Sequence, residues 1–240
     1  MQLVVGGILT DFRGRVLLQQ TGAKSLSPVR RALERGVLPT DTLARAFREE
    51  TGLIVMPVRL VALRYDAGVP GGELTFWFRC TMRGGDLETS AGRKPAGFFD
   101  PPLPAALPEA DRRQVDLAMH HTGGQPIMEE APTPLGLKLG RLLGSRKIAP
   151  EADHWRVEAS MLAQPVDTPL DWVIVEPGTS NAAPASAAAL VEQAQPPWAV
   201  AQRLAGQTQT PNSPTPSLAR VELAPDRPVM ALVFAPRSDE

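Results

Sequence analysis

Residues 44–53 (ARAFREETGL) constrain the fold of this chain more than any other stretch. They predict a short helix that begins at Thr40 or Asp41, either of which can cap its first turn, and that ends at Gly52, where a left-handed residue is expected. At about 100° per residue, one arc of this helix is apolar and predicts packing against a core. The adjoining arc carries, in angular order, Arg45, Glu49, Ala46 and Glu50. Two carboxylates therefore share one helical face.

This stretch resembles the Nudix box, whose pattern is G-x5-E-x7-R-E-U-x-E-E-x-G-U, with U a large aliphatic residue. The matching positions are Arg45, Phe47, Glu49, Glu50, Gly52 and Leu53. In that family the box glutamates hold divalent metal ions that position a water and a diphosphate, and hard cations such as Mg2+ prefer oxygen ligands. The resemblance implies catalytic roles for Glu49 and Glu50 as metal ligands, with Arg45 orienting them and Mg2+ or Mn2+ as cofactor.

The box is degenerate at three positions. Counted back from Arg45, the first box glutamate falls at Val37 and the opening glycine at Arg31, and Ala46 replaces the glutamate that normally follows the arginine. Two of the four box carboxylates are absent, and one of them would be a metal ligand. The substitutes to consider are Glu88, Asp86 and Asp100, of which we select Glu88 as the third metal ligand.

Basic and aromatic residues near the box are the candidates for ligand binding. The loop predicted over residues 22–39 is rich in arginine, and we expect Arg31 and Arg35 to contact the phosphates of a ligand. The alternative for each is a solvated side chain in a basic loop. Tyr65, the only tyrosine, is a candidate for stacking on a base, and packing at the end of a core strand is the alternative.

Charge and composition limit the classes of partner. Residues 1–150 carry 20 Lys and Arg against 15 Asp and Glu, whereas residues 151–240 carry 5 against 11. A basic first part suits phosphate-bearing ligands, and an acidic second part argues against a nucleic-acid-binding tail. The single cysteine, Cys80, fits a reducing compartment and reads as a small buried hydrophobe. No apolar stretch approaches the length of a bilayer span, so we expect a cytoplasmic protein without a membrane partner.

The hydrophobic pattern predicts an α/β protein with two parts. Strands are expected over 2–10, 15–20, 54–65, 73–82 and 96–99, with the first two as a hairpin, and a second helix over 108–121. The Nudix resemblance implies an α/β/α sandwich around a mixed sheet for residues 1–128. Residues 129–150 read as a connector that contains a short helix over 135–143. Residues 151–240 read as a small α+β unit with strands over 154–162, 171–176, 218–224 and 229–235 and helices over 185–194 and 198–204.

Two functions of different classes follow from the resemblance. The first is a Mg2+- or Mn2+-dependent hydrolase that cleaves a nucleoside diphosphate linked to another moiety. The second is a catalytically silent module that binds a nucleotide, which the replacements at Arg31, Val37 and Ala46 favour. Dimers are common in the family, so a homodimer is one assembly that the resemblance implies. For residues 151–240 the alternatives are a packing or dimerisation element and a lid or specificity element over the site.

Overall fold

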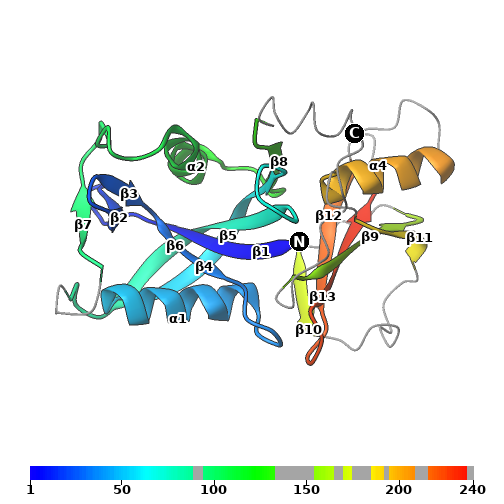
Figure 1. Cartoon of the computed structure of the whole chain (residues 1–240), viewed down its shortest axis with the longest axis horizontal. Helices are drawn as coiled ribbons and strands as arrows, with labels where there is room; N and C mark the ends of the chain where they lie inside the picture. The colour runs from blue at the N-terminus through cyan, green and yellow to red at the C-terminus, as the bar shows by residue number, and fades with distance from the viewer. Residues whose placement is uncertain are drawn as a thin grey trace.

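The computed structural model describes residues 1–88, 94–132, 154–164, 170–174, 185–191, 195–208 and 216–236. The predicted helix over 135–143 lies outside these residues. The elements of the first part are β1 (Gln2–Leu9), β2 (Val16–Gly22), β3 (Ser25–Ser27), β4 (Val29–Ala32), α1 (Pro39–Thr51), β5 (Ile54–Asp66), β6 (Glu73–Gly84), β7 (Ala96–Phe99), α2 (Glu109–His120) and β8 (Ile127–Glu130). Figure 1 shows them beside a second part built from β9 to β13 and α4.

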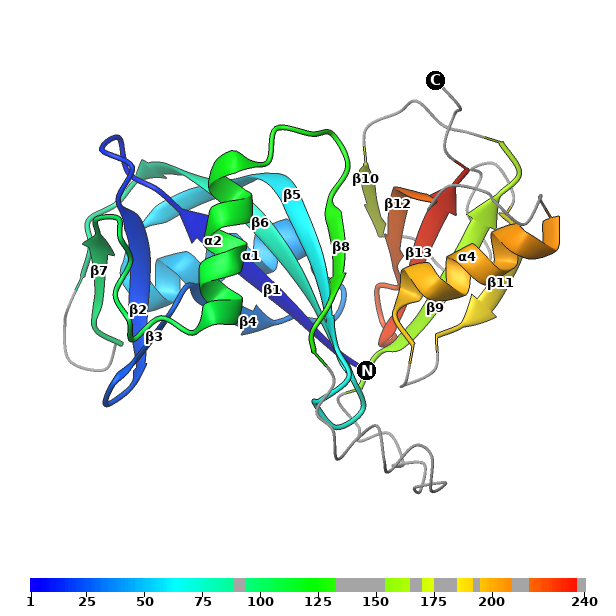
Figure 2. The same ribbon diagram turned by 90° about the horizontal axis from the view of Figure 1, so that it is seen from above.

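A mixed sheet forms the centre of the first part. Within the described residues its strand order is β4-β1-β6-β5-β8, with β1 parallel to β6 and β5 parallel to β8. Helix α1 covers one face of this sheet and α2 the other, as Figures 1 and 2 show. A smaller antiparallel sheet of β3, β2 and β7 stands at one end. The predicted α/β/α arrangement around a mixed sheet is therefore confirmed.

Helix α1 packs through the arc that its sequence marks as apolar. Leu43 and Phe47 are fully buried, at 0% exposure. Gly7 of β1 permits this packing, because a Cβ atom at that position would lie 2.5 Å from Cε2 of Phe47. Gly52 ends the helix with φ of 80° and donates its N–H to the Arg48 carbonyl, as predicted. The predicted start is wrong, because the helix begins at Pro39 without a side-chain cap.

The predicted hairpin of the first two strands forms only in part. A turn at Gly14 and a single bridge between Thr10 and Val16 connect β1 and β2. Beyond this bridge the strands separate, since β1 pairs with β4 and β6 whereas β2 pairs with β3 and β7. The predicted loop over 22–39 likewise contains two short strands, β3 and β4. Strand β4 adds to the edge of the central sheet, where Arg31 lies opposite Val5.

The second part is a small α+β unit, as predicted. Its elements are β9 (Arg156–Leu162), β10 (Asp171–Ile174), β11 (Ala185–Leu190), α4 (Pro197–Thr208), β12 (Ser217–Leu223) and β13 (Val229–Ala235). The strands form one sheet of order β10-β12-β13-β9-β11 in the described residues. The prediction of a helix over 185–194 is wrong for residues 185–191, the part of this range that the structure describes. Residues 185–190 are a strand because they pair antiparallel with β9.

The two parts contact each other through backbone and aromatic groups. Met1 and Trp155 exchange hydrogen bonds, since the Trp155 N–H donates to the Met1 carbonyl at 2.7 Å and the Met1 amine donates to the Trp155 carbonyl at 3.2 Å. Trp172 of β10 packs against Phe76 and Phe78 of β6, with ring centroids 5.7 and 5.6 Å away. This interface continues the hydrophobic core of the first part into the second.

Two further predictions concern single features. Cys80 is 3% exposed in β6, and burial raises the pKa of its thiol, so it is the buried hydrophobe that the sequence predicts. None of the helices that the structure describes is long and apolar enough to cross a membrane.

Candidate functional site

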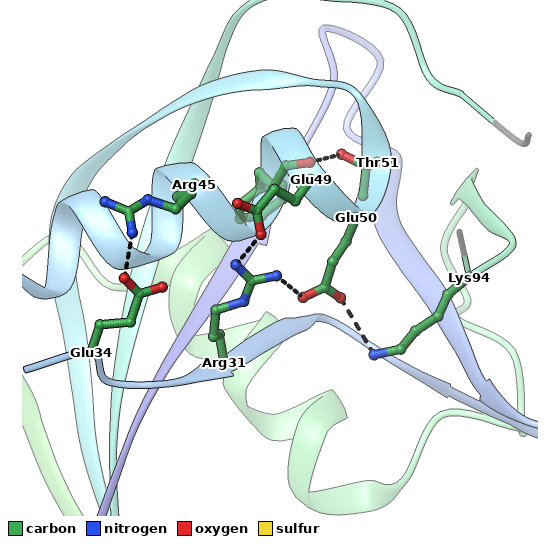
Figure 3. A network of polar contacts seen from close by, with 8 residues as sticks. Arg31, Glu34, Arg45, Glu49, Glu50, Thr51 and Lys94 are labelled. Carbon is green, nitrogen blue, oxygen red and sulfur yellow. Dashed lines mark hydrogen bonds and ion pairs between the residues drawn. The ribbon is translucent and has the colours of Figure 1, made fainter. Parts of the chain in front are cut away.

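An arginine joins the two box carboxylates at the C-terminal end of α1. The Arg31 side chain extends from β4 and donates from Nη1 to Glu49 at 2.5 Å and from Nη2 to Glu50 at 3.1 Å. Lys94 approaches the other oxygen of Glu50 at 3.4 Å. Figure 3 shows the Arg31 guanidinium between the two carboxylates and Lys94 beyond Glu50. Two positive and two negative side chains thus form a network without net charge.

The electrostatics of the network follow from these contacts. The hydrogen bond from Arg31 holds the pKa of the Glu49 carboxyl below its ordinary value, against a smaller desolvation effect, and the charges of Arg31 and Arg45 act in the same direction. Partial burial lowers the pKa of Arg31, but the hydrogen bonds and charges of Glu49 and Glu50 together raise it above its ordinary value. Both sides of the Arg31–Glu49 contact are therefore stabilised in their charged forms.

The remaining box residues are held by local contacts. Arg45 points away from Glu50 and forms an ion pair with Glu34 in the loop before α1 (Figure 3). The N–H of Glu88 donates to the Thr51 carbonyl at 2.9 Å, which places the backbone of Glu88 beside the end of α1. The exposed side chain of Glu88 thus starts near Glu49 and Glu50, although no set of potential metal ligands among the described residues includes it.

A polar pocket of about 410 Å³ lies beside this network. It is open on one side of the first part, between the small sheet, the edge of the central sheet and the start of α2. Arg31 and Lys94 belong to its wall, so the network and the pocket share two cations. The other described lining residues are Val4, Gln19, Thr21, Ser25, Leu26, Ser27, Arg30, Ala32, Glu73, Pro108 and Asp111. Its volume is in the range of small-molecule sites.

Buried polar groups line the floor of the pocket. Gln19 is 1% exposed, and its amide oxygen has no hydrogen-bond partner within the described residues. Arg30 donates to Glu73 at 2.6 Å through Nη2, while its buried Nε has no partner there. Asp111 is 6% exposed, and burial raises its pKa, with the Glu73 charge adding and the charges of Arg30 and another arginine opposing. Buried polar groups without partners are uncommon. Here they give this part of the pocket lining a polar character.

The three residues predicted from sequence to bind a ligand lie in three different surroundings. Arg31 lies at the pocket wall and contacts both carboxylates. Arg35 is exposed in the loop before α1 and is not among the described lining residues. Tyr65 is 1% exposed in the core, which favours the alternative of a packing residue. All described lining residues belong to the first part of the chain, so nothing there supports a lid formed by residues 151–240.

The residues present do not fit a divalent metal ion as arranged here. The oxygens of Glu49 and Glu50 face the Arg31 guanidinium, which would repel a second cation at the same place. Ala46 is fully buried and apolar where the box pattern has a carboxylate. In the part of the chain that the structure describes, no three Asp, Glu, His or Cys residues gather in a geometry that could hold a metal.

Sequence reasoning missed most of the pocket. Gln19, Glu73, Lys94 and Asp111 belong to separate elements, and no spacing in the sequence connects them. Arg30 lies in the arginine-rich loop predicted over residues 22–39, but nothing in the sequence distinguishes it from the other basic residues there. Neither β2 (VLLQQTG) nor β4 (VRRA) has a sequence pattern that specifies a pocket.

Comparisons with known proteins find matches among solved structures. No family model matches the sequence, and no curated protein matches it. Among solved structures, an ADP-ribose pyrophosphatase from Streptococcus suis 89-1591 is 18% identical and covers 54% of this chain and 98% of its own, with a TM-score of 0.45. A NUDIX hydrolase from Nitrosomonas europaea is 15% identical and covers 54% and 78%, with a TM-score of 0.45. A mutator MutT protein from Bacillus halodurans is 19% identical and covers 56% and 92%, with a TM-score of 0.44. These three structures match a little over half of this chain, with identities below 20% and TM-scores below 0.5.

Proposed function

We propose that the first part of the chain binds a nucleotide or a nucleoside-diphosphate derivative in the pocket beside α1, without a metal ion. The observation that carries this proposal is the shared position of Arg31 and Lys94, which line the pocket and at the same time neutralise Glu49 and Glu50. Two cations at one wall suit a diphosphate, and a guanidinium recognises phosphate oxygens through paired N–H groups.

The floor of the pocket suits the rest of such a ligand. The amide of Gln19 and the carboxyl of Asp111 are buried and offer hydrogen bonds to a planar polar group such as a nucleobase. Leu26 and Val4 add apolar surface to the same wall. Small-molecule sites are usually lined mainly by apolar residues with a few placed polar groups. This pocket is lined mainly by polar and charged residues, which suits a polar, charged ligand.

Binding is tested by thermal shift and calorimetry across a panel of nucleotides, nucleotide sugars and dinucleotides, each with EDTA and with Mg2+. We expect one class of ligand to stabilise the protein with EDTA present, and a ligand at a hundred times its Kd adds about 2.7 kcal/mol to the free energy of unfolding. Gln19→Leu should weaken this ligand, whereas Arg156→Ala, a charge removed from the exposed face of β9, should not. Absence of stabilisation by every ligand of the panel would refute the proposal.

Hydrolysis of a diphosphate bond is the second candidate. It is favoured by the position of Glu49 and Glu50 beside the pocket and by the Glu88 backbone next to them. We would measure cleavage across the same panel with Mg2+ and Mn2+, with a Glu49→Gln, Glu50→Gln double variant alongside. Cleavage that the double variant loses would establish the hydrolase. No cleavage by folded protein that binds a ligand would leave the binding module as the function.

A further inference from the structure

Arg31 stands at the position of the opening glycine of the box, and its contacts give this replacement a role. The side chain is fixed at its base because β4 pairs with β1 on the edge of the central sheet. From there the planar guanidinium gives one N–H to Glu49 and one to Glu50, at 2.5 and 3.1 Å. These are the two carboxylates that the box pattern assigns to metal binding.

The charges around these carboxylates are balanced within the protein. Arg31 and Lys94 supply two positive charges against the two negative charges of Glu49 and Glu50. Arg31 is the more central of the two cations, because it contacts both carboxylates and its side chain is 24% exposed, whereas Lys94 contacts only Glu50 and is 50% exposed. A divalent cation gains little from a site that is already neutral.

We infer that Arg31 is a built-in cation that takes the electrostatic place of a metal ion at this box, so that the wild-type site excludes divalent cations and loss of the Arg31 charge opens it to them. Protein sites for Mg2+ commonly supply one or two carboxylates while the ion keeps several waters and binds substrate phosphates, and carboxylates also suit Mn2+. Glu49 and Glu50 without Arg31 form such a pair. The inference goes beyond the proposed function, since cation binding can be measured without any nucleotide.

The test is Mn2+ binding to the full chain, measured by calorimetry and by the electron paramagnetic resonance signal of free Mn2+. We expect Arg31→Ala to bind one Mn2+ at least tenfold more tightly than the wild type. Adding Glu49→Gln and Glu50→Gln to this variant should abolish the gain. Arg48→Ala is the matched control, because it removes the same charge from an exposed position of α1 next to Glu49 and should leave Mn2+ affinity within about threefold of the wild type.

Two further variants separate charge from shape. Arg31→Gln removes the charge but keeps a shorter polar side chain. It should also bind Mn2+, and it replaces the alanine variant if that protein does not fold. Arg31→Lys keeps the charge and should bind Mn2+ as weakly as the wild type. Tight binding by Arg31→Lys would overturn the inference. So would equal affinity of wild type and the neutral variants, or saturable binding by the wild type with a Kd below about 10 µM, the weak end of the range of calcium sensors.

Discussion

The carboxylate of Glu50 offers the sharpest test of how the pocket wall works. It accepts ion pairs from Arg31 and Lys94, and its side chain is 15% exposed. Glu50→Gln keeps the size of the side chain and removes one negative charge, so the network of two carboxylates and two cations gains a net positive charge. If Arg31 and Lys94 hold the phosphates of a ligand, this change should strengthen binding.

The size of the effect follows from Coulomb's law. Two unit charges about 7 Å apart interact by about 0.6 kcal/mol in water, so a diphosphate with about two negative charges should gain about 1.2 kcal/mol. This is about sevenfold in affinity, since a tenfold change corresponds to about 1.4 kcal/mol. At physiological salt the Debye length is about 8 Å, which leaves about half of the energy and about a threefold change.

The assay is calorimetry with inorganic diphosphate and with the nucleotide that stabilises the protein, at low and at physiological salt and with EDTA. Glu158→Gln is the control, because it removes the same charge from β9, in the second part of the chain. A weaker affinity of Glu50→Gln than of wild type would refute the reasoning. That result would mean that Glu50 takes part in binding the ligand, as the hydrolase hypothesis requires, rather than competing with it for Arg31 and Lys94.

Two predictions concern stability. Trp172→Ala should lower the free energy of unfolding by about 2–4 kcal/mol, because a partly buried indole and two aromatic contacts are lost. Denaturant unfolding measures this loss, and Phe12→Ala is the control because the Phe12 side chain is 89% exposed. A loss below about 1 kcal/mol would contradict the packing. Burial raises the pKa of the Asp111 carboxyl above its ordinary 3.8, so the native state binds the carboxyl proton more tightly than the unfolded state does. The free energy of unfolding therefore falls as pH rises from below 3.8 through the native pKa. Asp111→Asn should therefore lose less stability than wild type between acidic and neutral pH, and identical pH profiles of the two proteins would show that burial does not act on this carboxyl.

The local sequence determined those elements whose pattern is strong by itself. The spacing of residues 44–53 predicts the apolar arc of α1 and the left-handed residue at Gly52, and the structure confirms both. The long apolar strands β5 and β6 and the hairpin of β12 and β13 are also evident from composition and alternation. In each case the signal and the structure involve neighbours in the chain, so no distant partner was needed to predict them.

Distant partners decided the elements that the sequence misjudged. The alanine-rich residues 185–190 have high helix propensity, yet they form β11 because the edge of β9 is available for pairing. The start of α1 was misjudged for a local reason instead: the helix begins at Pro39, before the predicted caps Thr40 and Asp41, since proline is well suited to the first helical position. Propensity is worth only fractions of a kcal/mol per residue, so pairing and packing override it.

The site shows the same division. The sequence determined that Glu49 and Glu50 lie on one helical face and that the box is degenerate at Arg31, Val37 and Ala46. Only the tertiary structure decided that Arg31, which lies in a predicted loop, extends from an edge strand to both carboxylates and shares a pocket wall with Lys94. The physical reason is that helical spacing is fixed by the backbone, whereas an ion pair between residues far apart in the chain depends on how strand and helix pack.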